Sequence, residues 1–261
     1  MRALYTAASG MTAYQTKIDN IANNLANANT TGYKKVREHF EDLVYQSMGG
    51  RGGEEGASAT NPLQVGSGVR LASLTRDTRN GDATATGNPF DVMINGPGFF
   101  VVESPSGEEL YTRDGAFVPD AEGNLVTAAG YRVAPGLQVP EGTQELVIGP
   151  DGTVTAKVDT GSGIEDTVLG QFELARFPNP GGLNAEGGNY FRATLASGEA
   201  QRGAPGEDAM GSLQQGALEA SNVDVAEELV GMITAQRSYE LSSKVIQAAD
   251  EMMSTAVNLR R

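Results

Sequence analysis

The chain contains no cysteine and no tryptophan, and its single histidine is His39. The missing cysteines exclude disulfides, thiol catalysis and cysteine-ligated metal sites, and one histidine leaves a typical zinc site without its usual ligands. We therefore expect no metal ion and no cofactor. Aromatic residues make up only 6% of the chain, so the core must be built mainly from Val, Leu, Ala and Met.

Long apolar runs are also missing. No stretch reaches the ~18 consecutive apolar residues of a membrane-spanning helix, so we expect no membrane span. A secretory signal needs an uninterrupted apolar run of ~7 to 15 residues, and none follows Arg2. We predict that the chain is cytoplasmic or is exported without a cleaved signal peptide.

The negative charge is concentrated in the middle of the chain. The first 45 residues have five Lys or Arg against four Asp or Glu, and residues 222–261 have four against six, so residues 46–221 carry −13 of the formal net charge of −14. Such a middle repels nucleic acid and anionic lipid, and we expect neither as a partner. The alternative interpretation is an acidic surface that serves only solubility.

Helix breakers are nearly absent from both ends. All 11 prolines lie between Pro62 and Pro205, and 31 of the 34 glycines lie between Gly49 and Gly216. At the N-terminus apolar residues recur at alternating steps of three and four, the spacing of a heptad seam. The positions are Leu4, Ala7, Met11, Tyr14, Ile18, Ile21, Leu25 and Ala28. This pattern predicts a helix over residues 2–28 that ends before Gly32, a glycine suited to the left-handed position after a helix.

The C-terminal end has a comparable pattern. Asp224 and Glu227 form a capping box, and helical periodicity then continues to about residue 259. Its seam consists of Leu229, Met232, Gln236, Tyr239, Ser243, Ile246, Met253 and Val257. A second stripe runs beside it, formed by Val230, Ile233, Leu241, Val245, Ala248 and Met252. Two stripes indicate neighbours on two sides, in an assembly or in an ordinary core.

Between the ends, short runs rich in β-formers alternate with turn signals. We predict antiparallel strands at residues 90–94, 99–103, 110–113, 125–127, 154–158 and 168–177, in a small barrel or sandwich. Turns are expected at Asn95-Gly96, Asp114-Gly115 and Asp151-Gly152 and at residues 121–124. Residues 33–48 include a short amphipathic piece and are followed by a Gly-rich loop at residues 49–56.

These patterns predict an α+β fold with long N- and C-terminal helices that form a coiled-coil-like module around a central antiparallel β-rich domain. We expect the terminal helical assembly module at residues 1–32 and 222–261, with a linking segment at 33–68. The outer β-rich domain covers 69–210, and a return linker covers 211–221. A β-rich body held between two helical ends suggests a protein that assembles.

Several motifs resemble the axial proteins of the bacterial flagellum. Residues 23–34 (NNLANANTTGYK) are similar to the N-terminal rod signature of that family. Residues 87–100 (GNPFDVMINGPGFF) and 111–117 (YTRDGAF) resemble its motifs at the start of the body, and 221–224 (SNVD) and 235–240 (AQRSYE) its C-terminal region. Residues 40–46 (FEDLVYQ) and 63–69 (LQVGSGV) look most like the distal-rod members, with the proximal-rod members as the nearest alternative.

The resemblance implies a structural subunit of the flagellar distal rod, in which terminal helices form the inner layers of a hollow helical polymer and the β domain faces outward. The rod would cross the periplasm and transmit motor torque to the hook. Implied partners are further copies of the chain, proximal-rod and hook axial proteins, the surrounding P and L rings, and the type III export apparatus that would carry the chain without a cleaved signal.

Candidate interface residues follow from the two seams and the amide-rich face of the first helix. For packing between helices we predict Leu4, Met11, Ile18, Ile21, Leu25, Leu229, Met232, Tyr239, Ile246 and Met253. For polar contacts we predict Asn23, Asn24 and Asn27.

No catalytic constellation is evident. Asp114 and Asp151 belong to turns, and His39 lies beside Glu38 and Glu41 without a nucleophile motif. Asp120, Glu122 and Asn124 alternate as calcium ligands do, but the other ligands of an EF-hand loop are missing, which favours a solvated hairpin.

The main alternative to assembly is a secreted adhesin or binding module that carries its β domain on an intramolecular helical stalk. A stalk is folded in the isolated monomer, whereas rod-type termini remain largely disordered until they polymerise.

Overall fold

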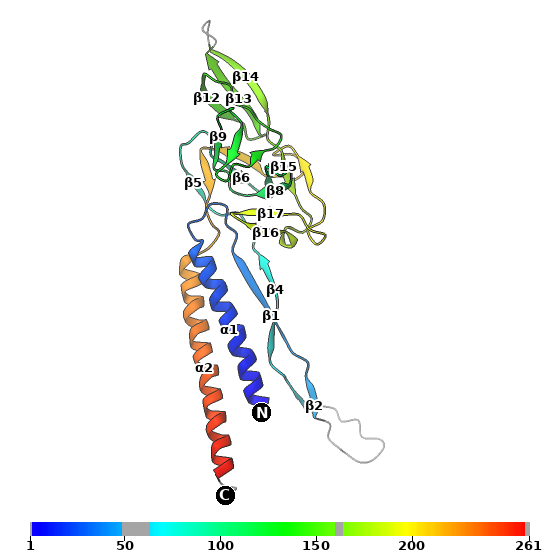
Figure 1. Ribbon diagram of the computed structural model, residues 1–261, viewed down its shortest axis with the longest axis vertical. Helices are drawn as coiled ribbons and strands as arrows, with labels where there is room; N and C mark the ends of the chain where they lie inside the picture. Colours follow the sequence, from blue (N-terminus) through cyan, green and yellow to red (C-terminus); the bar gives the residue numbers. More distant parts are fainter. Residues whose placement is uncertain (1, 49–62, 160–163, 259–261) are drawn as a thin grey trace, which may run out of the picture. The chain divides into compact units, whose positions relative to one another are not determined.

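The structure is a computed structural model that describes residues 2–48, 63–159 and 164–258 (Figure 1). The predicted Gly-rich loop at residues 49–56 lies outside these ranges. The chain is α+β, with an N-terminal helix, a C-terminal helix and a β-rich centre between them, as the sequence predicts. It divides into two compact units. The helical unit comprises residues 1–26, 36–75 and 224–261, and the β unit comprises residues 27–35 and 76–223.

The helical unit contains helix α1 (Arg2–Ala26), helix α2 (Val225–Asn258) and strands β1 (Val36–Asp42), β2 (Gln46–Met48), β3 (Leu63–Val65) and β4 (Val69–Arg76). The two helices lie side by side and run antiparallel (Figure 1). A Cβ atom built on Gly10 would lie 3.7 Å from Ser242 Oγ, and one on Gly231 would lie 3.5 Å from Ile21 Cδ1. From Gly10 to Ile21 is eleven residues along α1, and from Ser242 to Gly231 is eleven residues back along α2. The two helices therefore keep one register over this length.

The helix ends follow local capping chemistry. Asp224 Oδ1 accepts hydrogen bonds from the backbone N–H of Ala226 at 2.8 Å and of Glu227 at 3.2 Å, which confirms Asp224 as the N-cap of α2. Helix α1 ends at Ala26, two residues earlier than predicted. Gly32 has the expected positive φ of 67°, but it lies six residues beyond the helix and so is not its C-terminal cap.

The linking segment forms strands rather than a helical amphipathic piece. Strand β1 alternates half-buried and exposed residues, the period of a strand. It pairs with β4, and the pair is extended by a hydrogen bond from Leu43 N to Gly68 O at 2.9 Å. His39 therefore lies in a strand, where its Nε2 is 2.8 Å from Thr75 Oγ1. Because of this pairing, most of β4 belongs to the helical unit, although residues 69 onward were predicted to be part of the outer domain.

The β unit is built from short antiparallel strands. They are β5 (Ala83–Ala85), β6 (Val92–Asn95), β7 (Phe99–Glu103), β8 (Glu109–Thr112), β9 (Phe117–Pro119), β10 (Leu125–Thr127), β11 (Arg132–Val133), β12 (Thr143–Ile148), β13 (Thr153–Asp159), β14 (Ile164–Gln171), β15 (Leu174–Arg176), β16 (Asn184–Gly187), β17 (Tyr190–Arg192), β18 (Gln201–Gly203), β19 (Ser212–Gln215) and β20 (Ala217–Glu219), with a 3₁₀ turn at Pro180–Gly182. The main sheet has the order β16-β17-β8-β7-β11-β10-β9, and β15 joins β7 and β18. Strands β12-β13-β14 form a second sheet, and β19-β6 and β20-β5 form pairs.

Strand β7 lies at the centre of the core. Phe100 and Val102 point into one cluster of buried residues, and Phe99 and Val101 point into another. Both faces of the strand are therefore buried, which explains its continuous apolar run. The ring of Phe100 packs edge-on against Phe117 with centroids 5.0 Å apart.

Two of the predicted turns form hairpins and one predicted strand is divided. Asp151-Gly152 joins β12 to β13, and residues 121–124 join β9 to β10. Asn95-Gly96 instead separates β6 from β7, which pair with different strands. The predicted strand 168–177 is two strands, β14 and β15, because the chain changes sheets at Phe172, whose ring stacks on Phe117 in the core.

The predicted return linker at residues 211–221 is also strand. β19 pairs with β6, and β20 pairs with β5. Leu213, Ala217 and Glu219 are buried, so these strands belong to the core of the β unit. The β unit therefore continues to residue 223 rather than ending at residue 210.

Candidate assembly surface and the buried cluster of the β unit

The predicted seam of α1 faces the inside of the helical unit. Ile21 is only 4% exposed, and Leu4, Met11, Ile18 and Leu25 are half-buried. The predicted α2 seam is only partly buried: Met232, Tyr239 and Ile246 are half-buried, whereas Leu229 and Met253 are exposed.

The buried side of α2 contains Glu228 near its start and otherwise smaller residues. Ala235 and Ala249 are buried, Gly231 faces Ile21, and Ser242 faces Gly10. Small side chains let two helix backbones approach closely, so this side packs better against α1 than a row of large residues. The sequence prediction gave priority to large apolar residues. It therefore placed the α2 seam about one residue further along the helix than the side that is buried against α1.

Helix α2 is longer than its partner. It has 34 residues and α1 has 25, a difference of about 14 Å at ~1.5 Å per residue. The register between the helices brings the start of α1 opposite Ala249 and Asp250. Met253 and Val257 therefore lie beyond the start of α1, which explains why both are exposed.

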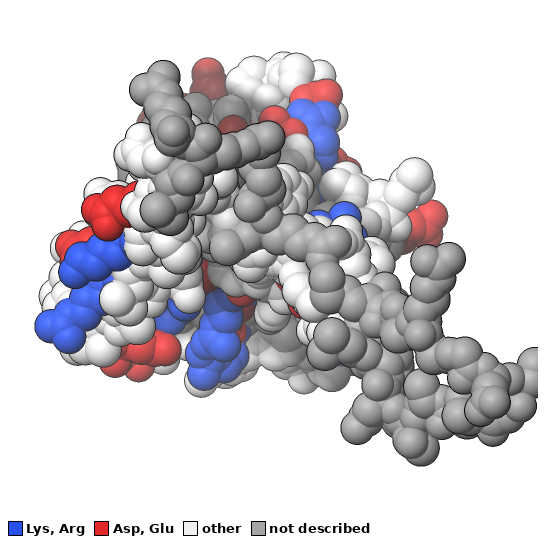
Figure 2. Space-filling model, turned by 90° about the horizontal axis from the view of Figure 1, so that it is seen from below, with Lys and Arg blue, Asp and Glu red and all other residues white. Residues whose placement is uncertain are grey.

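The second stripe of α2 is exposed along the helix. We call this set the α2 apolar stripe: Val230, Ile233, Leu241, Val245, Ala248 and Met252. Its five large members are 50–66% exposed. Among the described residues, fifteen of the nineteen exposed large apolar side chains lie in the helical unit. The stripe has two parts, Val230 with Ile233 and Leu241 to Met252, separated by the exposed Arg237. Exposed apolar side chains gathered on one side of a helix in this way indicate an interaction site. Figure 2 shows uncharged surface between small groups of charged residues.

The amide-rich face of α1 binds the following strand. Asn24 is 1% exposed; its Nδ2 donates to Val36 O at 3.0 Å, and its Oδ1 accepts from Val36 N at 3.1 Å. Asn20 Nδ2 also donates to Val36 O at 2.9 Å. These bonds satisfy the first backbone groups of β1. Asn24 thus makes its buried contacts within the chain, while Asn23 is exposed and Asn27 accepts a bond from Thr30 Oγ1 at 3.2 Å.

A buried group of charges in the β unit was not found from the sequence. Glu219 is 2% exposed. Its Oε1 accepts from Lys34 Nζ at 2.6 Å and from Gly81 N at 2.9 Å, and its Oε2 lies 3.3 Å from an Arg113 guanidinium nitrogen. One carboxylate therefore holds together three segments that are far apart in the chain.

The two cations of this group are bound further by backbone oxygens. Lys34 Nζ donates to Arg79 O at 2.8 Å, and Arg113 donates to Gly96 O at 2.7 Å. Burial, together with the charge of Arg113, lowers the pKa of Lys34, and Glu219 opposes this effect. Burial likewise lowers the pKa of Arg113. Each cation depends on Glu219 because desolvation disfavours the charged form.

Gly32 allows the segment after α1 to approach the body closely. Its N–H donates to Glu219 O at 2.8 Å. A Cβ atom at this position would lie 2.8 Å from the backbone of Arg113 and Asp114, closer than real contacts allow. Together with the positive φ, this approach requires glycine. The TTGYK part of the sequence motif therefore positions Lys34 beside Glu219.

Asp114 gives a pH-dependent test of this region. Burial raises its pKa, opposed by hydrogen bonds from Ala116 N and Thr31. Because the folded state then binds the proton more tightly than the unfolded state, the stability contribution of Asp114 falls as the pH rises from about 4 through the folded pKa. We therefore compare the free energy of unfolding of Asp114→Asn with that of the natural chain by urea titration at successive pH values. The difference, variant minus natural chain, should increase as the pH rises through this window.

The matched control is Asp151→Asn. Hydrogen bonds from the Thr153 hydroxyl and N–H lower the pKa of Asp151, so the same difference should change with pH in the opposite direction. A flat or falling profile for Asp114→Asn would contradict the effect of burial.

The described residues contain no cluster of three or more His, Cys, Asp or Glu side chains able to hold a metal ion. Asp120 Oδ1 accepts from the N–H of Glu122 at 2.9 Å and of Asn124 at 2.7 Å, within the predicted hairpin that joins β9 to β10. Within the same described ranges, neither helix is apolar enough over the required length to cross a membrane.

Three family models define the class of protein. Residues 4–34 match the flagella basal body rod protein, residues 93–156 match the D1 domain of the flagellar hook protein FlgE/F/G, and residues 214–259 match the C-terminal part of the flagellar basal body rod FlgEFG protein. These segments include α1, the first strands of the core and α2.

Curated relatives cover the whole chain. The flagellar basal-body rod protein FlgG of Borreliella burgdorferi is 48% identical over 100% of this chain and 99% of its own length. FlgG of Caulobacter vibrioides is 45% identical over the full length of both, and FlgG of Bacillus subtilis is 39% identical over the full length of both. The chain belongs to the family of flagellar basal-body rod and hook proteins and is a structural subunit of the basal-body rod.

Proposed function

We propose that the chain is the distal-rod subunit of the flagellum and that it self-assembles into a hollow helical shaft that transmits motor torque to the hook. The observation that carries this proposal is the α2 apolar stripe, which is exposed although it runs along a long helix already packed against α1 on another side. If other copies of the chain cover this stripe, the assembly is stabilised by about 25 cal/mol for each Å² of apolar surface that is buried. Many such contacts make a shaft stiff.

In this proposal the terminal helices form a coiled-coil-like inner module. The predicted packing residues Leu4, Met11, Ile18, Ile21 and Leu25 of α1 and Met232, Tyr239 and Ile246 of α2 support the helix pair. Leu229 and Met253 are exposed and would contact other copies. Asn23 and Asn27 remain proposed to make polar contacts between helices. Asn24 makes its buried hydrogen bonds to Val36 within the chain.

The acidic β unit would then face outward, toward the surrounding P and L rings. Proximal-rod and hook proteins would contact the two ends of the shaft, and the type III apparatus would export the chain to the periplasm. A proximal-rod subunit is the alternative within the family. The distal rod is favoured because residues 40–46 and 63–69 look most like the distal-rod members, and the relatives at 39–48% identity are named flagellar basal-body rod protein FlgG.

A secreted adhesin on a helical stalk is the alternative outside the family. A stalk that functions alone gains nothing from an exposed apolar stripe, which would instead promote aggregation. The stripe and the rod relatives both favour assembly.

The variant Leu241→Glu tests the proposal. Leu241 is 62% exposed, so the monomer should keep its unfolding free energy within about 0.5 kcal/mol while the amount of polymer, measured by sedimentation and electron microscopy, falls sharply. Gln247→Glu introduces the same charge at another exposed position of α2 and is the matched control. Unchanged polymerisation of Leu241→Glu would refute the stripe as the assembly surface.

A further inference from the structure

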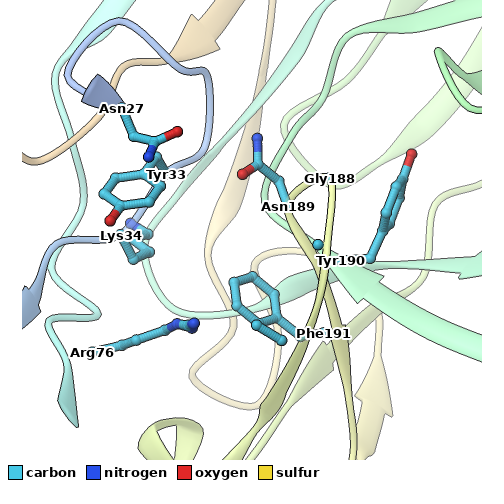
Figure 3. A pocket seen from close by; sticks show the side chains of 10 residues that line it. Asn27, Tyr33, Lys34, Arg76, Gly188, Asn189, Tyr190 and Phe191 are labelled. Atoms are coloured by element: carbon cyan, nitrogen blue, oxygen red, sulfur yellow. The ribbon is translucent and has the colours of Figure 1, made fainter. Parts of the chain in front are cut away.

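A pocket of about 210 Å³ lies within the β unit, between the segment that follows α1 and the loop before β17. Aromatic side chains Tyr33 and Phe191 and amides Asn27 and Asn189 line it, together with Arg76. Figure 3 shows the Arg76 side chain extending toward Phe191. The volume suits one or two side chains rather than a large ligand.

The walls of the pocket are fixed by the fold. Asn189 has a positive φ of 66°, and its Nδ2 donates to Thr31 O at 2.8 Å. Thr30 Oγ1 donates to Asn27 Oδ1 at 3.2 Å. The Asn189 bond connects the two sides of the pocket, and the Thr30 bond fixes Asn27 within the segment that follows α1.

Arg76 differs from the other arginines of the β unit. Its guanidinium carbon lies 5.1 Å from the centroid of the Phe191 ring, and burial lowers its pKa. Within the described residues no carboxylate forms an ion pair with it. The other six arginines of this unit each bond to a carboxylate or a backbone carbonyl: Arg79, Arg113, Arg132, Arg176, Arg192 and Arg202.

A half-buried guanidinium that stacks on a ring and has no anion partner in the described part of the chain favours a ligand with a planar, negatively charged group. A carboxylate matches the guanidinium with two parallel hydrogen bonds. Partial desolvation strengthens such a pair relative to one on the open surface. The supply of carboxylates is large, because the chain has 33 Asp and Glu residues against 19 Lys and Arg residues.

We propose that the pocket at Arg76 receives the carboxylate of an Asp or Glu side chain from a neighbouring copy of this chain. The inference rests on the proposed self-assembly and adds to it a specific contact of the β unit, separate from the α2 apolar stripe. It gives the acidic β units an attractive contact where their net charge alone would make them repel.

Polymerisation of the natural chain is measured first and tests the proposed function by itself. Polymerisation of Arg76→Gln then tests the proposed contact at the pocket. We expect Arg76→Gln to raise the critical concentration for polymerisation by about tenfold or more. Arg132→Gln, which removes an exposed arginine 3.8 Å from Glu122, should leave it unchanged. An unchanged critical concentration for Arg76→Gln would overturn the proposal.

A cross-linking experiment remains decisive even if Arg76→Gln destabilises the monomer. The variant Arg76→Lys places an amine at the pocket, and it is copolymerised with an excess of ¹⁵N-labelled natural chain and treated with a carbodiimide. We expect an amide cross-link between unlabelled position 76 and a labelled Asp or Glu, present in polymer and absent from monomer. The 2.7 Å pair of Lys157 and Glu145 is the internal positive control. Formation of the control cross-link without any mixed-isotope cross-link at position 76 would overturn the proposal.

Discussion

Replacing Ile21 by Asp is expected to separate α1 from α2 and to abolish assembly, while the β unit stays folded. Ile21 is 4% exposed and faces Gly231, so the new carboxylate would be buried away from water against the partner helix. Lost packing and the burial of a charge together cost about 4 kcal/mol or more. Circular dichroism should show a loss of helical signal, and sedimentation should show no polymer.

Ala22→Asp is the control for the monomer, because Ala22 is the exposed neighbour of Ile21 on the same helix. It should retain the helical signal. Ile246→Asp, on the other helix, should also reduce the helical signal. The reduction should be smaller than for Ile21→Asp, because Ile246 is only half-buried. Loss of the β signal in Ile21→Asp would contradict the division into a helical unit and a β unit.

Replacing Glu219 by Gln is expected to lower the unfolding free energy of the β unit by about 3–5 kcal/mol. The amide keeps the shape of the side chain but leaves Lys34 and Arg113, 4% and 3% exposed at their side chains, as buried cations without an anion. The urea midpoint of the β unit should fall while the slope of the transition stays the same.

Two further variants identify the cause. Glu145→Gln removes one carboxylate from the exposed pair with Lys157 and should leave the urea midpoint nearly unchanged. The triple variant Lys34→Met, Arg113→Met, Glu219→Leu removes all three charges and should recover much of the lost stability. A Glu219→Gln protein as stable as the natural chain would show that the three charges do not hold these segments together.

Local patterns predicted the parts of the fold that depend on neighbouring residues. Residues 99–103 form β7 as predicted, since a run of four large apolar residues can be satisfied by a strand buried on both faces. Asp224 caps α2 because capping involves only the next three residues. The two terminal helices follow from their periodicity and from the near absence of glycine and proline.

Features that depend on distant residues could not be predicted in this way. Glu219 acquires its partners at positions 34 and 113 only through the fold, and an isolated glutamate within a predicted linker gives no sign of a buried cluster. The packed side of α2 is built mostly from small residues, which a search for large apolar side chains at helical spacing does not detect. Strand β1 was interpreted as a link because its partner, β4, lies beyond the Gly-rich loop.

Amide hydrogen exchange on the dilute chain and then on its polymer tests the central claim most directly. The claim is that other copies of the chain cover the exposed side of α2. We predict fast exchange at the C-terminal end of α2, beyond the start of α1, in the dilute chain, and strong protection of Leu241 to Asn258 in the polymer, while β6 and β7 are protected equally in both states. Full protection of both helices in a dilute monomer, with no further gain in any polymer, would contradict the account and favour an intramolecular stalk.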